Sequence, residues 1–308
     1  MMQEEKGGDR IMAKHSHVSY SQKIKSLVKL IEQAAYRHSV WQVFSDFLEM
    51  SSVSISNSID PVHREEREKR YMEIVKGYNK AEINLFPQML AELVNSLEQC
   101  AQEKRLDDIL GKTFHELELH NKYKGQFFTP QSVCNMMGSM SAVNAEEALK
   151  QQKYFTVCEP CIGSGAMVLG LANDLARKNI NYCQRMVVTG ADIDLKCVHM
   201  AYLQLSLYGI PAVIIHGNTL TCEEWSRWYT PVYIAEGWIF RQRCGITGDA
   251  GRETDEQLKM ALDPMYAAFR KIDAITRAQP KNEDKAPIKK TDKKKLWFFF
   301  FEPQKEDI

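Results

Sequence analysis

The sequence predicts an α/β protein in which a helical N-terminal region precedes a domain built on a parallel sheet. In the first third of the chain, apolar residues recur at intervals of three and four, the spacing of amphipathic helices. After residue 150 the pattern changes to short apolar, β-branched runs that alternate with helical stretches. Such an alternation is typical of parallel strands joined by helical crossovers.

The helical region is expected over residues 21–141, after a disordered stretch at residues 1–20. Its apolar repeats lie in Ile24–Ile31, Val40–Leu48, Leu85–Leu97 and Ile109–Leu117. The serines and the asparagine of Ser51–Asp60 predict a connector. The charged run Arg64–Arg70 predicts a solvated helix face, with contact to a DNA backbone as the alternative.

The sheet domain is expected over residues 142–280. Three apolar runs predict its strands, which are Tyr154–Cys158, Met186–Gly190 and Ala212–His216. The helices between them are expected at Ala166–Lys178 and Leu195–Leu207. Glu223–Tyr229 is too polar for a buried strand, whereas Pro231–Phe240 is strand-like. Residues 281–308 are rich in Lys and predict a disordered tail, with a docking peptide at Trp297–Phe301 as the alternative.

Composition indicates a soluble globular protein, since 44% of the residues are hydrophobic and 40 Lys and Arg balance 40 Asp and Glu. This balance disfavours nucleic-acid binding by bulk attraction, although a local basic groove is compatible with it. The acidic N-terminus does not resemble a signal peptide, and no apolar run approaches the ~20 residues that span a bilayer. Eight cysteines in such a chain favour reduced thiols. We expect a cytoplasmic protein without membrane contact.

A glycine-containing loop, Glu159-Pro160-Cys161-Ile162-Gly163-Ser164-Gly165, joins the first predicted strand to the helix that begins at Ala166. In a parallel sheet such a junction lies at the ligand-binding edge, where the free N–H groups of the helix are available. Gly163 and Gly165 allow a ligand to approach the backbone closely. The loop therefore predicts a nucleotide-type cofactor.

Acidic residues around this loop favour one cofactor over another. A pyrophosphate loop needs a third glycine at position 168, which is occupied by Val168, so a dinucleotide is disfavoured. The carboxylate of Glu159 suits the ammonium and sulfonium groups of S-adenosylmethionine better than a pyrophosphate. Asp192, which ends the second strand, can accept hydrogen bonds from both ribose hydroxyls. Asn218, at the end of the third strand, can face an adenine edge.

A pair of cysteines, Cys158 and Cys161, has the spacing of redox and zinc motifs. No second pair and no His-rich partner follows it, and Cys158 lies at a strand end within the glycine motif. We therefore expect no metal and no redox chemistry.

The order of these motifs resembles that of the N-6 adenine DNA methyltransferases related to the modification subunits of type I restriction systems. The resemblance extends from about Asp107 to Leu220. Besides the glycine loop and the Asp192 turn, it includes Asp108-Ile109-Leu110-Gly111, Gly125-Gln126-Phe127-Phe128-Thr129-Pro130 and Gly217-Asn218-Thr219-Leu220. It implies a Rossmann-like S-adenosylmethionine-dependent methyltransferase domain, here with a shortened C-terminal half.

The resemblance also assigns residues to the cofactor. Thr129 and Pro130 are expected to begin the helix Gln131–Met140, as N-cap and first helical residue. In the family, this segment closes over the methionine part of the cofactor. The implied cofactor site consists of Phe128, Thr129 and Pro130, of Glu159, Pro160, Gly163 and Gly165 around the methionine, of Asp192 at the ribose, and of Asn218 at the adenine.

The family's catalytic motif is Asn, Asp or Ser followed by Pro-Pro and an aromatic residue. A flipped base stacks on the aromatic ring while its exocyclic amine donates to the polar side chain. This sequence contains no Pro-Pro. Thr230, Pro231 and Tyr233 are the candidate catalytic residues, with an aromatic loop packed on the sheet edge as the alternative. Asp263-Pro264-Met265-Tyr266 has suitable residues, but its surroundings favour a helix start.

Two functions follow from these patterns. The first is an S-adenosylmethionine-dependent, adenine-specific DNA methyltransferase that uses the Thr230 segment and relies on a partner for DNA recognition. The second is a catalytically incomplete homologue that binds the cofactor and acts as a regulatory or scaffold subunit. The expected partners are DNA and a larger methyltransferase, specificity or restriction subunit.

Overall fold

The structure of the protein is a computed structural model, which describes residues 24–117, 128–238 and 241. The chain divides into two compact units, Met1–Ile234 and Ala235–Ile308, and nearly all described residues belong to the first. The predicted boundary between residues 141 and 142 falls inside the first unit, and the division into domains stays a prediction. Predictions for residues 1–20, 263–266 and 281–308 lie outside the described residues.

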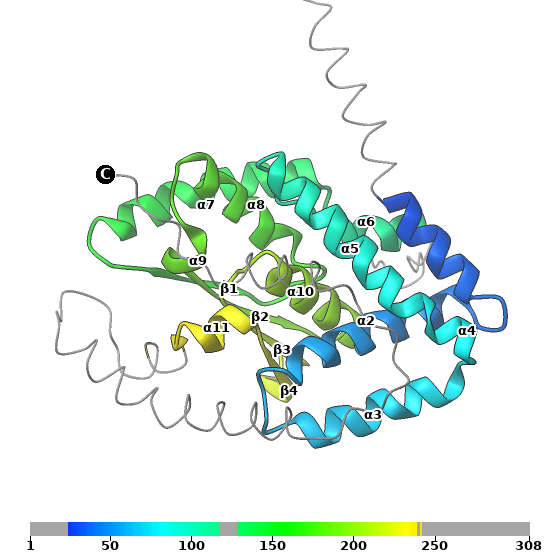
Figure 1. The fold of residues 1–308 in the computed structure, drawn as a ribbon. Helices are drawn as coiled ribbons and strands as arrows, with labels where there is room; N and C mark the ends of the chain where they lie inside the picture. The colour runs from blue at the N-terminus through cyan, green and yellow to red at the C-terminus, as the bar shows by residue number, and fades with distance from the viewer. Residues whose placement is uncertain (1–23, 118–127, 239–240, 242–308) are drawn as a thin grey trace, which may run out of the picture. The chain divides into compact units, whose positions relative to one another are not determined.

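The N-terminal region is helical, as predicted (Figure 1). A helix at residues 24–34 is followed by α2 (Val40–Ser56), α3 (Arg64–Gly77), α4 (Lys80–Ile83), α5 (Leu85–Gln102) and α6 (Ile109–Glu116). The connector predicted at Ser51–Asp60 is wrong over its first half, because α2 continues to Ser56. Its serines do not end the helix because Met50 and Val53 bury their side chains beside them, and the Ser54 hydroxyl donates to the Met50 carbonyl at 2.8 Å.

The charged segment at Arg64–Arg70 is not uniformly solvated. Arg67 is 8% exposed, pairs with Asp60 at 2.9 Å and donates to the backbone carbonyl of Arg227 at 2.8 Å. Its guanidinium also lies 4.1 Å from the centre of the Trp228 ring. The prediction of a solvated face is therefore wrong for Arg67, which joins α3 to the sheet.

The sheet has four strands in the part of the chain that the structure describes, in the order β1-β2-β3-β4. β1 (Phe155–Glu159), β2 (Met186–Asp192) and β3 (Ala212–Asn218) are parallel. α8 (Ala166–Arg177) and the short α9 (Tyr182–Arg185) connect β1 to β2, and α10 (Leu195–Leu207) connects β2 to β3. These elements confirm the α/β pattern expected from the sequence.

The last strand corrects two expectations. The polar segment Glu223–Tyr229 forms β4, which pairs antiparallel with β3 across a short turn. An edge strand tolerates polar side chains on its exposed face, and Trp228 supplies the buried contact. The strand-like run from Pro231 instead begins the helix α11 (Pro231–Ala235), since Pro favours the first position of a helix.

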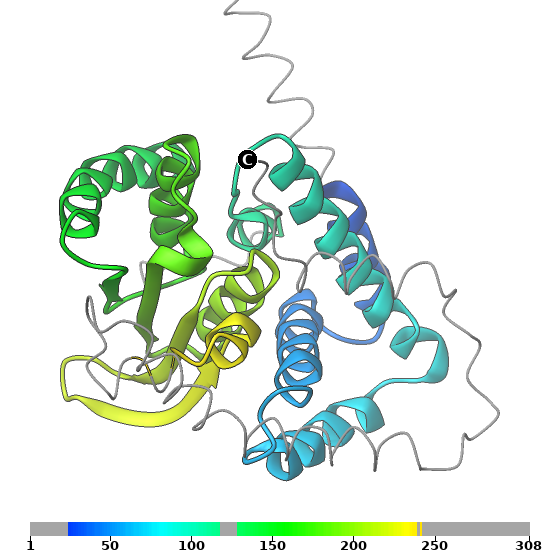
Figure 2. The same ribbon diagram turned by 60° about the vertical axis from the view of Figure 1, so that its left-hand side comes forward.

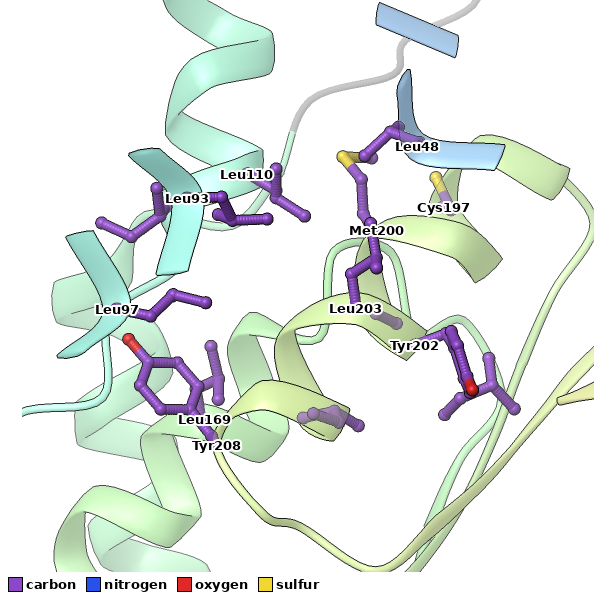
Figure 3. Packing of buried hydrophobic residues seen from close by; sticks show 14 of the residues in the cluster. Leu48, Leu93, Leu97, Leu110, Leu169, Cys197, Met200, Tyr202, Leu203 and Tyr208 are labelled. Carbon is purple, nitrogen blue, oxygen red and sulfur yellow. The ribbon is translucent and has the colours of Figure 1, made fainter. Parts of the chain in front are cut away.

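One hydrophobic cluster joins the helical region to the sheet. Helix α10 lies at its centre, with every residue from Cys197 to Ser206 buried, and packs against α2 and β3. Figures 1 and 2 both show α2 alongside α10. The close view in Figure 3 shows Leu48 of α2, Leu93 and Leu97 of α5 and Leu110 of α6 around Met200 and Leu203 of α10. Burial of these side chains fixes α10, and with it the ends of β2 and β3.

Helix α7 (Gln131–Leu149) is longer than predicted and packs closely along α8. A Cβ atom on Gly138 would lie 2.3 Å from the backbone of Gly170, and one on Gly170 would lie 2.3 Å from the Cys134 carbonyl oxygen. The two glycines therefore let the helix backbones touch. Within the described residues, no helix has the length and apolarity that a bilayer span requires.

Candidate functional site

The candidate site lies at the carboxyl edge of the parallel strands. The glycine loop follows β1, and Asp192 ends β2 directly beside His216 of β3 in the strand register. The Ile162 N–H donates to the Ala191 carbonyl at 2.9 Å, which ties the loop to the end of β2. The sequence thus brings loop and acid together, as expected for the ligand-binding edge of an open sheet.

The loop takes a conformation that depends on its glycines. Gly163 has φ +56° and Gly165 has φ +94°, both in the left-handed region that side chains disfavour. A Cβ atom on Gly163 would also lie 3.2 Å from the Phe128 ring, closer than nearly all Cβ contacts, so the ring would have to shift by a few tenths of an ångström. Gly165 is the residue that precedes α8. The loop can therefore present its backbone to a ligand while Phe128 covers one side.

The carboxylate of Asp192 anchors the loop. One oxygen accepts from the Gly163 N–H at 2.9 Å and the other from the Asp194 N–H at 2.9 Å. Burial raises the pKa of Asp192 above that of an ordinary aspartate, against the opposing effect of these hydrogen bonds. The side chain is only partly exposed, and Asp192 is one of the residues that line the cavity.

A cavity of about 910 Å³ opens at this edge, a size common for small-molecule sites. Four predicted site residues line it, which are Phe128, Thr129, Gly163 and Asp192. The sequence reasoning missed Asp194, His216, Met167 and Leu195, among others. Two of these had a signal, because Asp194 lies in the same turn as Asp192 and His216 ends the third predicted strand.

The walls of the cavity carry carboxylates and no cation of their own. None of the described residues that line it is Lys or Arg, whereas Asp192 and Asp194 are both lining residues. Lys196 neutralises Asp194 at 2.8 Å and lies 5.0 Å from the Trp41 ring centre. Burial lowers the pKa of His216, which favours the neutral ring. The cavity suits a ligand that carries hydroxyl groups or positive charge better than a phosphate.

The region that contains the cavity is similar to a known protein family. Residues 106–241 match the model of the N-6 DNA Methylase family. This match covers less than half of the chain, and it shows a similarity to that family. The matched segment contains α6, the glycine loop, Asp192 and the whole sheet. No curated protein sequence matches the chain.

Two solved structures are similar to this chain at low sequence identity. A candidate class I S-adenosylmethionine-dependent methyltransferase from Listeria monocytogenes is 12% identical to this chain, with a TM-score of 0.37. The alignment covers 70% of this chain and 69% of that protein. The methyltransferase subunit of a type I restriction-modification system from Streptococcus thermophilus is 16% identical, with a TM-score of 0.33. The alignment with it covers 68% of this chain and 60% of that subunit. The similarity to the family rests on the sequence match.

Five predicted cofactor residues do not line the cavity: Pro130, Glu159, Pro160, Gly165 and Asn218. Asn218 instead holds the turn between β3 and β4, because its side-chain oxygen accepts from the Leu220 N–H at 3.0 Å. Glu159 borders a second hollow of about 380 Å³, between β1 and the helices α7 and α8. Pro130 is the N-cap of α7, a position expected for Thr129. The helix therefore begins one residue later than predicted.

The predicted catalytic residues lie at the other end of the sheet. Tyr229 pairs with Val213, near the amino end of β3, and Thr230 follows it. Thr230 is fully buried, accepts from the Ala212 N–H at 2.8 Å and donates to the Ile210 carbonyl at 2.9 Å. Thr230, Pro231 and Tyr233 therefore do not line the cavity, because β4 runs antiparallel and carries them away from the glycine loop. Their catalytic role stays a prediction. Tyr233 is buried and stacks with Tyr229 at 5.7 Å.

Proposed function

We propose that the protein is an S-adenosylmethionine-dependent DNA methyltransferase that acts on the exocyclic amine of adenine. The observation that carries this proposal is the carboxylate-lined cavity at the glycine loop of a region similar to the N-6 DNA methylase family. The proposal includes a Rossmann-like sheet, of which the parallel strands β1, β2 and β3 form one half.

The residues at the cavity fit S-adenosylmethionine. The cavity, with a volume of about 910 Å³, accommodates a nucleoside that carries a methionine group. The ligand carries an ammonium and a sulfonium group, and two carboxylates without a lining Lys or Arg suit such charges. A pyrophosphate would instead meet the carboxylate of Asp192, which has no salt bridge among the described residues. The donor set therefore favours the sulfonium cofactor over a dinucleotide.

Each wall has a separate role in this proposal. Asp192 accepts from the ribose hydroxyls, while its two backbone hydrogen bonds keep the carboxylate in place. Gly163 brings the loop backbone to the methionine part, and Phe128 and Thr129 cover it from the opposite side. His216 bounds the cavity beside Asp192 and is neutral at physiological pH, because burial lowers its pKa. Its ring packs edge-to-face on the Trp225 ring, with 4.8 Å between the ring centres. When bound, the cofactor supplies the methyl group carried by its sulfonium.

The remaining requirement is a group that aims the adenine amine at the cofactor. Such a group must reach the nitrogen within hydrogen-bond distance. Thr230 is engaged with the backbone of β3 and of its preceding turn. This observation favours a second candidate function, in which the chain binds the cofactor as one subunit and a larger methyltransferase, specificity or restriction subunit completes the site for DNA.

Two measurements test the proposal. Calorimetry with S-adenosylmethionine and with NAD should give binding of the first only. Methyl transfer to DNA, followed by mass spectrometry of the nucleosides, should then give N-6 methyladenine. Cofactor binding without transfer by the chain alone, restored by a co-purified subunit, would select the second candidate. Absence of cofactor binding would overturn both.

A further inference from the structure

We infer that Asp108 is a positioning residue for the methyltransferase site, and that helix α6 sets the spacing between the two walls of the cavity. This inference rests on the proposed function, which identifies the cavity as the cofactor site. It concerns residues that do not line the cavity themselves, with the exception of Ser164 and Phe128.

The carboxylate of Asp108 holds three groups from three different parts of the chain. It accepts from the Ser164 hydroxyl at 2.6 Å, from the Gln204 side-chain amide at 2.9 Å and from the Gly111 N–H at 2.8 Å. Asp108 is 4% exposed and caps the N-terminus of α6, where the helix dipole favours a negative charge. Charged acceptors with several donors form strong hydrogen bonds in a buried setting.

Ser164 connects this hydrogen-bond network to the glycine loop. It is 1% exposed and stands between Gly163 and Gly165, the two loop residues with positive φ. Glycines leave a loop free to adopt many backbone conformations, so a fixed side chain between them restrains both neighbours. The hydroxyl donates to Asp108, and Ser164 is also one of the residues that line the cavity.

Gln204 closes the network from α10. Its amide nitrogen donates to both Asp108 and the Ser164 carbonyl, the latter at 2.8 Å, and its oxygen accepts from the Leu110 N–H at 3.1 Å. Gln204 is fully buried, so each of these groups would lose its partner rather than gain water if the network were broken. The loop is thereby fixed to the most buried helix of the core.

The other end of α6 holds the opposite wall. The Phe114 ring lies 5.1 Å from the Phe128 ring, and the His115 ring lies 5.5 Å from it. The Phe128 N–H also donates to the His115 ring at 3.3 Å, and the Phe128 ring faces Gly163. One eight-residue helix therefore contacts the loop through its N-terminus and the covering aromatic through its last turn.

A neighbouring acid provides a matched control. Asp107 is also 4% exposed, but it interacts with Arg105 at 3.4 Å and with Lys112 at 3.7 Å, and none of its hydrogen bonds in the described structure reaches the loop. Asp107→Asn removes a buried charge of the same kind one residue away. It should change stability without loosening the loop.

The first experiment is hydrogen–deuterium exchange of the peptide that covers Glu159–Ala166, which needs no cofactor. We expect faster exchange in Ser164→Ala and Asp108→Asn than in the native protein or in Asp107→Asn. Native exchange in Ser164→Ala, or equal loosening by Asp107→Asn, would overturn the inference. Ser164→Ala deletes one hydroxyl, so it keeps the test informative even where Asp108→Asn folds poorly.

The second experiment measures the affinity for S-adenosylmethionine in the same variants. Ser164→Ala and Asp108→Asn should each weaken binding about tenfold. The double variant should bind no more weakly than the single variant with the larger loss of affinity, because both changes break the same hydrogen bond. Additive losses would contradict a shared role. If the native protein binds no S-adenosylmethionine, the proposed function fails while the exchange experiment still decides the role of Asp108.

Discussion

The two ends of the parallel strands carry predicted site residues, yet they differ in what those residues do. At the carboxyl end, Asp192 bonds two backbone N–H groups and still borders a cavity. At the amino end, Thr230 is fully buried and its hydroxyl links β4 to the start of β3. A polar residue near a strand end is thus a site residue only where backbone geometry also leaves space for a ligand.

The difference extends to the surroundings of each end. The carboxyl end is built from glycines with positive φ, an aromatic cover and acids. The β4 side is built from stabilising contacts, with Arg67 and His199 packed on Trp228. Changes at the carboxyl end should therefore affect ligand binding, and changes on the β4 side should affect folding. The predictions below test this division.

The largest expected effect is on the β4 side. Replacing Arg67 with Met leaves Asp60 buried without its arginine and removes the bond to the Arg227 carbonyl. Because breaking one half of a buried ion pair is costly, the free energy of unfolding should fall by about 3 kcal/mol in urea denaturation. His63 remains as a second partner of Asp60 at 2.8 Å and limits the loss.

Arg70 provides the control for that change. It lies one turn along the same helix and pairs with Glu49 at 2.8 Å, but its side chain is half exposed. Arg70→Met should cost under ~1 kcal/mol, as exposed ion pairs usually do. Equal destabilisation by both substitutions would show that Arg67 does not hold the sheet edge.

The next effect belongs to the carboxyl end. Asp192→Ala should weaken S-adenosylmethionine binding by roughly thirtyfold, the equivalent of about 2 kcal/mol, because it removes a charged acceptor. The control Asp174→Ala removes an acid in the last turn of α8 that bonds Ser139 and Lys178 and does not line the cavity, so it should leave the affinity unchanged. Equal affinity of Asp192→Ala and the native protein would remove Asp192 from the site.

The same residue gives a pH test. Burial raises the pKa of Asp192, so the carboxylate takes up its proton at a higher pH than an ordinary aspartate does. The hydrogen bonds to the ribose need the ionised form, and cofactor affinity should therefore decline as the pH falls from about 7 toward about 4. Asp192→Asn should lack this decline, as calorimetry at each pH would show.

The sequence predicted the carboxyl end well because local patterns determine it. The glycine loop, the strand that ends at Asp192 and the helix at Leu195–Leu207 are all readable from apolar runs and turn residues. The acids around the loop also predicted a cationic ligand, which stays a prediction. Asp194 and His216 were missed because their place at the cavity depends on the register between β2 and β3.

The β4 side was predicted poorly because distant contacts determine it. Arg67 belongs to a charged run, and its burial follows from meeting Trp228 about half the chain away. β4 itself has no apolar alternation, and it is a strand because the Asn218 turn folds it back on β3. Once its direction is antiparallel, Thr230 must lie at the amino end, which no spacing rule along the chain can reveal.

A smaller effect is expected from His199, which lies 4.8 Å from the Trp228 ring. Burial lowers its pKa to about 3, and repulsion by His216 in its protonated form and by Arg67 adds to that effect while Asp194 opposes it. The unfolded chain takes up this proton below about pH 6.5, and the folded chain does not. Stability should therefore fall with decreasing pH, by about 2 kcal/mol between about pH 7 and about pH 5.

Urea denaturation at the two pH values measures that contribution. The difference between them should shrink by about the same amount in His199→Phe, whatever the absolute stability of the variant. An unchanged difference would show that other groups cause the loss of stability in acid.

The smallest expected effect decides the role of Thr230. Thr230→Val keeps the shape of the side chain but leaves the Ala212 N–H without its acceptor, so unfolding should become easier by about 1 kcal/mol. Thr230→Ser retains the hydroxyl and should recover most of this loss. Both variants should bind S-adenosylmethionine like the native protein, because the residue lies at the end of the sheet opposite the cavity. If Thr230→Val abolished methyl transfer at native stability and cofactor affinity, while Thr230→Ser retained it, the hydroxyl would belong to the catalytic site after all.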